Sequence, residues 1–299
     1  MHNTETYGFT PILGWSITRY EVFRTCLRQY YYQYYGKFDA ETDTGRVQRL
    51  RALTSIPLQV GSVTHDCIAE LLGRLQKRPT EPIDRRRLSD FITNKAGQAA
   101  SSTEFSETYY GQVRAVDLQS IASPAFDALI NLIESERFEW IVRVAASNQE
   151  GWIVDPPGYG ETRIDGLKAY CKVDFVFPVQ STFHILDWKT GRERPEKHAA
   201  QLRAYAAWAI RNLGSAVEKT RPIAAYLLPE YRETAVEFGA SDLEGFAGLV
   251  RAQTEEMYAL CSDVEENVPL SKEAFPLIEP SAVCEYCNFR ELCGRSAFS

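Results

Sequence analysis

Apolar residues form two short runs near the middle of the chain, VDFVF at residues 173–177 and FHILDW at residues 183–188. Both runs are rich in Val, Phe and Ile, and the turn-like segment PVQST separates them, so the pattern predicts a β-hairpin. A turn centred on the QS pair of that segment would place Asp174 directly opposite Asp187. Lys189 would point to the same side, because side chains alternate along a strand.

Helical spacing of apolar residues marks a second kind of segment. In VGSVTHDCIAELLGRL, residues 60–75, the spacing predicts a helix that carries His65 in its first turns. Nearer the N-terminus, Thr18 and Glu21 form a capping-box pattern. The segment that follows is expected to continue as an aromatic-rich helix containing Cys26.

A further helix and strand are expected after the hairpin. Pro195 is expected to begin the helix, and Gln201 and Tyr205 within it share a face at i, i+4 spacing. Apolar strands are expected at residues 223–228 and, before the hairpin, within residues 140–145. The expected core order is therefore helix, strand, hairpin, helix and strand.

Asp174 and Asp187 are unusual residues for apolar strands. Two carboxylates directly opposed across a sheet destabilise it unless something holds them there. A divalent cation such as Mg²⁺ or Mn²⁺ would do so, since these ions are bound through carboxylates, water and substrate phosphate. A lysine beside such a site could orient or deprotonate a water, or neutralise charge in a transition state. The alternative interpretation is a solvated hairpin with polar residues on its outer face.

The composition narrows the class of protein. With 299 residues, of which 44% are hydrophobic and 24% charged, the chain is typical of a soluble globular protein. It has no apolar run of about 18 residues and no signal-like start, so a cytoplasmic protein without a membrane span is expected. The net charge of −7 argues against an indiscriminate nucleic-acid coat protein but leaves room for a local basic channel. The cations between residues 74 and 87 fit a solvated helix face better than a binding site.

Three of the seven cysteines, Cys284, Cys287 and Cys293, lie close together near the C-terminus in CEYCNFRELC. Such short spacings are typical of a metal or cluster site in a cytosolic protein. Zinc and cubane clusters both favour four ligands, and the remaining candidate for a fourth is the distant Cys26. The other three cysteines lie in apolar or helical settings, where a buried inert thiol is expected.

Taken in order, these motifs resemble the PD-(D/E)XK nucleases of the RecB-like branch, which includes the CRISPR-adaptation exonucleases with an iron–sulfur cluster. GSVTH resembles the Gly-x-x-x-His element of that family, VDF its first acidic residue, DWK its acid-x-Lys element and QLRAY its Gln-x-x-x-Tyr element. The cysteines resemble its one-plus-three arrangement around a [4Fe–4S] cluster. The resemblance covers residues 18–293, except for residues 77–137. Leu27 replaces a frequent proline, and Asp187 replaces a frequent glutamate, for which aspartate is an accepted alternative.

The resemblance implies a role for each motif. Lys189 would position the attacking water and stabilise developing charge, while Gln201 and Tyr205 would face the same cleft and hold the substrate backbone or the lysine. The implied ligands of one or two Mg²⁺ or Mn²⁺ ions are His65, Asp174, Asp187 and the carbonyl of Trp188. The implied ligands of the [4Fe–4S] cluster, for which zinc is the alternative, are Cys26, Cys284, Cys287 and Cys293.

The implied fold is α/β, a restriction-endonuclease-like core with a mixed central sheet flanked by helices. An added helical region and a cluster joining the N- and C-terminal segments would complete it. Residues 1–135 would form a helical region with Cys26 and His65, residues 136–240 the nuclease core, and residues 241–299 the C-terminal helix and the three-cysteine segment.

The implied activity is metal-dependent hydrolysis of DNA by an exonuclease acting on single-stranded ends, in recombination, repair or phage defence including CRISPR adaptation. Helicase, recombination or defence-system proteins are possible partners, and any ATPase among them would be a separate chain because no GxxxxGK[ST] motif is present. The alternative is a DNA-binding scaffold subunit of a larger complex. A scaffold would be marked by a broken active site, whereas every motif residue is present here.

Overall fold

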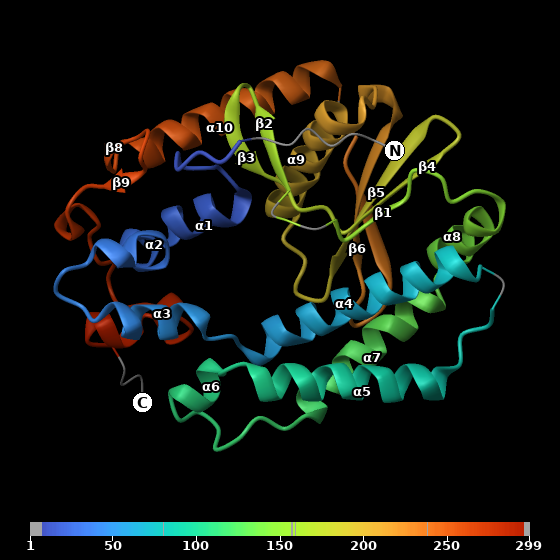
Figure 1. The fold of residues 1–299 in the computed structure, drawn as a ribbon, viewed down its shortest axis with the longest axis horizontal. Coiled ribbons are helices and arrows are strands. Elements are labelled where there is room, and N and C mark those ends of the chain that lie inside the picture. The colour runs from blue at the N-terminus through green and yellow to red at the C-terminus, as the bar shows by residue number, and fades with distance from the viewer. Residues whose placement is uncertain (1–7, 80, 157, 159, 238, 296–299) are drawn as a thin grey trace.

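A mixed five-stranded sheet lies at the centre of the protein, with its strands in the order β1-β4-β5-β6-β7 (Figure 1). The computed structural model describes residues 8–79, 81–156, 158, 160–237 and 239–295. Only the β5–β6 pair of this sheet is parallel, and helix α9 makes the crossover that such a pair requires. The strands are β1 (Ile153–Val154), β4 (Phe175–Val179), β5 (Thr182–Lys189), β6 (Thr220–Tyr226) and β7 (Arg232–Ala235). The α/β fold that the family resemblance implied is confirmed.

The β4–β5 hairpin has the register that the sequence predicted. Phe175 pairs with Leu186, and continuing this register by one residue places Asp174 opposite Asp187. Asp187 and Lys189 then lie on the same side of β5, since side chains alternate along a strand. Leu186 and Trp188 point to the opposite side, where they join the apolar cluster beneath the sheet.

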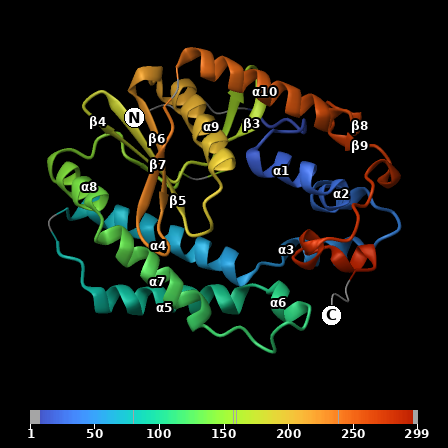
Figure 2. The ribbon, with the colours of Figure 1, turned by 180° about the vertical axis from the view of Figure 1, so that it is seen from behind.

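Helices cover both faces of the sheet (Figures 1 and 2). Apolar residues of α4, α5, α7 and α8 form one core with Phe175, Phe177 and Leu186, and residues of α9 and α10 form the other core with Val176 and Ile185. The expected helix at Pro195 and the helical character of the region after residue 77 are confirmed. The helices named here are α4 (Ile56–Lys77), α5 (Arg85–Ser102), α6 (Ser106–Tyr109), α7 (Gln119–Ile133), α8 (Glu136–Ser147), α9 (Pro195–Leu213) and α10 (Ala240–Tyr258).

The N-terminal helices lie beside the C-terminal segment, although the two are at opposite ends of the sequence (Figures 1 and 2). The ring of Phe275 packs 5.0 Å from the ring of Tyr31, and Lys272 Nζ lies 3.1 Å from Asp39 Oδ1. The elements of this region are α1 (Ile17–Thr25), α2 (Leu27–Tyr35), α3 (Thr44–Ala52), β8 (Cys261–Asp263), β9 (Val268–Pro269) and α11 (Ala282–Glu285). Strands β2 (Glu161–Ile164) and β3 (Leu167–Tyr170) form a separate hairpin.

The strand expected within residues 140–145 is wrong, because this segment belongs to helix α8. The β-branched residues Ile141, Val142 and Val144 suggest a strand. However, Phe138, Ile141 and Ala145 are all buried, and their spacing of three and four residues is that of one helix face. The strand that precedes β4 in the central sheet is instead the short β1.

Two helix boundaries also differ from the expectation. The first helix is capped by Ser16, whose hydroxyl accepts from the Arg19 N–H, rather than by Thr18. It ends before Cys26, which has an extended backbone (φ −161°, ψ 113°) and caps the start of a second helix. The one aromatic-rich helix expected from the sequence is therefore two helices. Helix α4 begins at Ile56, which places His65 in its middle rather than in its first turns.

Near its start, α9 is anchored on β6 by a neutral histidine. Nδ1 of His198 accepts a hydrogen bond from the Tyr226 hydroxyl at 2.5 Å and one from the backbone N–H of Arg194 at 3.4 Å. The proton of the neutral ring is therefore on Nε2. Burial, together with the nearby Lys189, lowers the pKa of His198 to about 4.

The folded pKa of His198 lies below the ordinary value of 6.5, so the unfolded chain binds the proton first as the pH falls. Its stabilising contribution is complete above pH 6.5 and is lost towards pH 4. We expect the free energy of unfolding to fall more between about pH 7.5 and about pH 5 in the wild type than in His198→Gln, by about 1 kcal/mol. Chemical denaturation at both pH values measures this difference, and equal falls would contradict it.

Candidate active site

Four elements bring the motif residues together. Asp174 stands one residue before β4, and Asp187 and Lys189 lie at the end of β5. Helix α4 supplies His65 from one side, and helix α9 supplies Gln201 and Tyr205 from the other. All the side chains that the sequence predicted for this site are therefore neighbours in the structure. They are His65, Asp174, Asp187, Lys189, Gln201 and Tyr205, with the backbone of Trp188 between them.

A chain of polar contacts links α9 to β5. Lys189 Nζ donates to Gln201 Oε1 at 2.8 Å, and Gln201 Nε2 donates to the Tyr205 hydroxyl at 2.6 Å. That hydroxyl donates to Asp187 Oδ1 at 3.1 Å. Lys189 also forms an ion pair with Asp187 Oδ2. The lysine and the carboxylate are thus held in place by residues one helical turn apart on α9.

The second half of the site joins α4 to the hairpin. His65 Nδ1 lies 3.2 Å from Asp174 Oδ1, and His65 Nε2 lies 3.0 Å from the carbonyl oxygen of Trp188. The other carboxylate oxygen of Asp174 accepts the Trp188 N–H at 2.9 Å. Both ring nitrogens of His65 therefore face oxygen acceptors, an arrangement that suits a protonated imidazole.

Burial and mutual charge set the protonation of the two carboxyls. Asp187 is 2% exposed, and burial, with a further contribution from Asp174, raises its pKa to about 6 although Lys189 opposes this. Burial also opposes the ionisation of Asp174, but the charge of His65 and the hydrogen bonds from His65 and Trp188 outweigh it and lower the pKa of that carboxyl. Burial disfavours the charged form of His65, yet the two aspartates raise its pKa. The site thus holds one carboxylate ionised and the other poised to bind a proton.

Comparison with known proteins identifies the family in which this group of side chains occurs. The model of the PD-(D/E)XK nuclease superfamily matches residues 14–294. The chain belongs to the PD-(D/E)XK nuclease superfamily. Membership indicates a nuclease, which is a hydrolase. The search of curated proteins found no match. The solved structure of SSO0001 matches 70% of this chain and 98% of its own chain, with 13% sequence identity and a TM-score of 0.31. A TM-score this low does not establish a shared fold.

Nucleases of this superfamily typically use divalent metal ions such as Mg²⁺. Within the described residues, no group of three or more His, Cys, Asp or Glu side chains is arranged to hold a metal ion. The donor set at the hairpin nevertheless has the right chemistry, with two carboxylates, a backbone carbonyl and one imidazole. Asp187 Oδ2 is buried without a hydrogen-bond partner and is met only by the ion pair with Lys189. Such an oxygen-rich position suits a cation.

The four cysteines singled out in the sequence of this nuclease line one small cavity at the break between α1 and α2. Burial raises the pKa of Cys287 to about 12. Burial also acts to raise the pKa of Cys284, but hydrogen bonds from Ser281 and Arg295 outweigh burial and lower this pKa. The Arg295 guanidinium lies 2.9 Å from Cys284 Sγ. The cavity is lined by Cys26, Cys284, Cys287 and Cys293. Cys67 and Cys171 are buried elsewhere, as expected, and Cys261 is only half-buried beside Tyr35.

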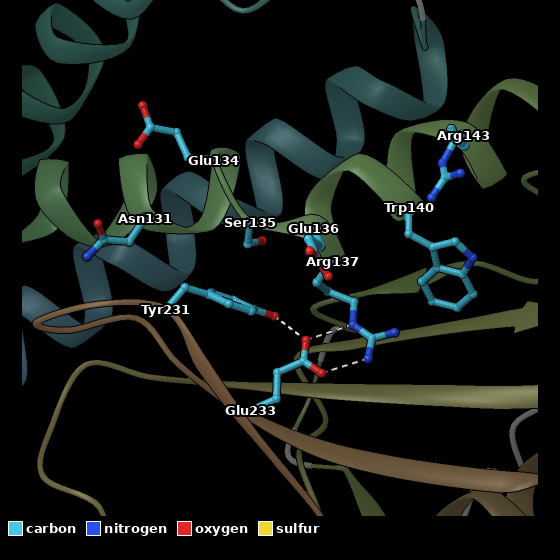
Figure 3. Close-up of a pocket in the computed structure, with 9 residues that line it drawn as sticks. All are labelled: Asn131, Glu134, Ser135, Glu136, Arg137, Trp140, Arg143, Tyr231 and Glu233. Carbon is cyan, nitrogen blue, oxygen red and sulfur yellow. Dashed lines mark hydrogen bonds and ion pairs between the residues drawn. The ribbon is translucent and has the colours of Figure 1, made fainter.

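A different cavity of the nuclease, of about 620 Å³, lies between the α7–α8 junction and β7 (Figure 3). Arg137 makes two hydrogen bonds to Glu233, at 2.7 and 2.6 Å, and the Tyr231 hydroxyl donates to the same carboxylate. The guanidinium also lies over the ring of Trp140. The arginine is thus neutralised within the protein, and none of the residues that line this cavity belongs to the cluster around Asp187.

Sequence reasoning missed one neighbour of the site. Tyr226 of β6 pairs with Lys189 in the parallel register, and burial, followed by Glu193 and Asp187, raises its pKa. In the sequence this tyrosine sits in an apolar strand with no motif around it. Only the pairing of β5 with β6 brings it beside the lysine.

Within the described part of the chain, every helix is too short or too polar to cross a membrane.

The Tyr205 hydroxyl can be removed without disturbing the packing of its ring. We expect Tyr205→Phe to lower the turnover rate of DNA cleavage about tenfold, because Asp187 loses a fixed donor, while stability falls by only about 1 kcal/mol. Tyr110→Phe is the matched control, since its hydroxyl donates to the Asn288 carbonyl at 2.6 Å, away from the site. Steady-state kinetics and thermal melts measure both variants. Equal activities would show that the Tyr205 hydroxyl has no part in catalysis.

Proposed function

We propose that this nuclease is an active, Mg²⁺- or Mn²⁺-dependent deoxyribonuclease of the RecB-like branch, and an exonuclease that acts on single-stranded ends. The observation that carries the proposal is the unbroken chain of contacts from Lys189 through Gln201 and Tyr205 to the buried Asp187. A scaffold subunit released from catalysis has no need to keep a buried carboxylate beside a lysine, because burying charge is costly. Preference for single-stranded ends rests on the resemblance of the motifs to RecB-like enzymes.

The proposed chemistry is hydrolysis without a covalent protein intermediate. His65, Asp174, Asp187 and the Trp188 carbonyl would hold the metal ion, which would supply Lewis-acid activation of a water and of the scissile phosphate. Lys189 would orient the attacking water and stabilise negative charge on the phosphate oxygens. Gln201, which holds Lys189 Nζ at 2.8 Å, would keep the ammonium group in place during the reaction.

We propose further that Cys26, Cys284, Cys287 and Cys293 bind a [4Fe–4S] cluster that connects the two ends of the chain. The support is that all four thiols line one cavity, although Cys26 lies near the N-terminus and the other three lie near the C-terminus. Recombination, repair or phage defence, including CRISPR adaptation, is the proposed context, with a separate helicase, recombination or defence protein as partner. Zinc at the same cysteines is the alternative occupant.

The nuclease proposal is tested with end-labelled single-stranded DNA in Mn²⁺. We expect Lys189→Ala to lower the cleavage rate at least about 100-fold, because it removes charge stabilisation without touching a proposed metal ligand. The matched control is Lys219→Ala, which removes an exposed lysine just before β6 whose Nζ donates to Ser181 in the β4–β5 turn, at the opposite end of β5 from Lys189. The fate of the label gives the polarity of cleavage.

Two results would overturn the nuclease proposal. If the wild type cleaves neither single- nor double-stranded DNA nor RNA, a DNA-binding scaffold subunit becomes the better assignment. If Lys189→Ala is as active as the wild type, Lys189 is not the catalytic lysine.

The cluster proposal is tested by metal analysis of protein purified without oxygen. We expect about four iron and four sulfide per chain, and loss of both in Cys284→Ala. Cys67→Ala is the control, because this thiol is buried away from the cavity. About one zinc per chain without iron would replace the cluster with a zinc site, and the absence of both metals would contradict any role of these cysteines as ligands.

A further inference from the structure

A groove of about 720 Å³ runs along helix α4, with α5 on one side and the end of β1 on the other. In Figure 1, α4 passes between the sheet and α5 in this region. The residues that matter here are Asp66, Gly73, Arg74, Lys77, Arg78 and Lys95, together with Asp155. The volume is that of a pocket for a small ligand, so it can hold part of one nucleic-acid strand but not a duplex.

One end of the groove lies next to the active site. Asp66 lines it and directly follows His65 on α4. Asp155 lines it as well, and its backbone N–H donates to the carbonyl oxygen of Asp174 at 2.8 Å. One end of the groove therefore lies beside both halves of the His65–Asp174 contact, through the chain at Asp66 and through a backbone hydrogen bond at Asp155.

Cations gather towards the other end of the groove. Arg74, Lys77 and Arg78 come from the last turns of α4 and the residue that caps it. Lys95 of α5 lines the groove nearer its middle, with Nζ 3.9 Å from the carboxylate of Glu70, which also lines it. Lys77 and Arg78 are exposed, and Arg78 shares the carboxylate of Glu81 with Arg74, at 3.3 and 3.2 Å. Exposed cations in a channel attract a polyanion, and pairing with Glu81 on the surface costs little to break.

Gly73 lies between the two ends of the groove and has no structural explanation. Glycine inside a helix costs about 1 kcal/mol relative to alanine. Nothing lies within 4 Å of the position that a Cβ of Gly73 would occupy, so close packing does not require it. Its effect is to leave bare helix backbone at the floor of the groove, which allows close approach of a ligand.

We propose that this groove binds the phosphodiester backbone of the DNA strand on one side of the scissile phosphate, an inference that rests on the proposed nuclease function. Asp66 and Lys77 are separated by about 16 Å along the helix axis. That distance corresponds to about five nucleotides at the stacked spacing of 3.4 Å. The cations between residues 74 and 87 are then divided in function, with Lys77 and Arg78 at the strand and Arg85 and Arg86 on the solvated face of α5.

The test measures binding of labelled single-stranded DNA in the Lys189→Ala background, which keeps the strand uncut. We expect Lys77→Gln/Arg78→Gln to raise Kd about tenfold at low salt and to reduce the salt slope of log Kd by about 1.4, since each single-strand contact contributes about 0.7. The matched control is Arg85→Gln/Arg86→Gln, which removes the same charge from exposed residues of α5 outside the groove. We expect it to change neither quantity. Gly73→Phe, which fills the groove without changing charge, should weaken binding as well.

The outcomes separate this inference from the proposed function. If the wild type degrades DNA and the two double variants bind alike, the groove is not the path of the strand and the nuclease proposal stands. If the wild type degrades no nucleic acid but the groove variants alone lose binding, the groove is a nucleic-acid site of a scaffold protein. If Gly73→Phe binds as tightly as the background protein, the strand does not lie over α4.

Discussion

The structure of the active site depends on the burial of Asp187 beside a second carboxylate. Asp187 is 2% exposed, and an ion buried in this way costs several kcal/mol unless it is compensated. The compensation comes from three directions, because Lys189 follows it on β5, Tyr205 reaches it from α9, and His65 from α4 balances Asp174. Each partner is on a different element, so the site exists only when α4, the hairpin and α9 are all in place.

The two apolar cores, one on each face of the sheet, hold α4, the hairpin and α9 in place together. Because the faces of β5 alternate, Leu186 and Trp188 fix the strand to the α4 side while Asp187 and Lys189 face α9. Helix α9 is also the crossover between the parallel strands β5 and β6, and His198 anchors its start on Tyr226. The helix that holds the lysine in place is thus tied to the same strands that carry the lysine and its neighbour.

The hairpin could be predicted because its information is local. The turn and the two apolar runs determine which residues oppose each other, and the register of Phe175 with Leu186 followed from them. The strand expected at residues 140–145 was wrong because a short apolar run has no local feature that separates a buried strand from a helix face. The approach of His65 to Trp188, and of Tyr226 to Lys189, depends on how whole elements pack. The His65 contact could be expected only through the family resemblance. The Tyr226 contact could not be expected at all, because Tyr226 belongs to none of the motifs that carry the resemblance.

The closure of the two chain ends depends on more than the cysteines. Tyr31 of α2 packs on Phe275, Arg28 donates to the Phe275 carbonyl at 2.7 Å, and the Asn288 side chain donates to the Leu53 carbonyl at 2.8 Å. These contacts join the N-terminal helices to the C-terminal segment through side chains that bind no metal. The cavity at Cys26 is therefore shaped by packing, and the break between α1 and α2 that turns this cysteine towards the other three is part of the fold. A metal group bound there would reinforce a closure that already exists, because its ligands need little further ordering.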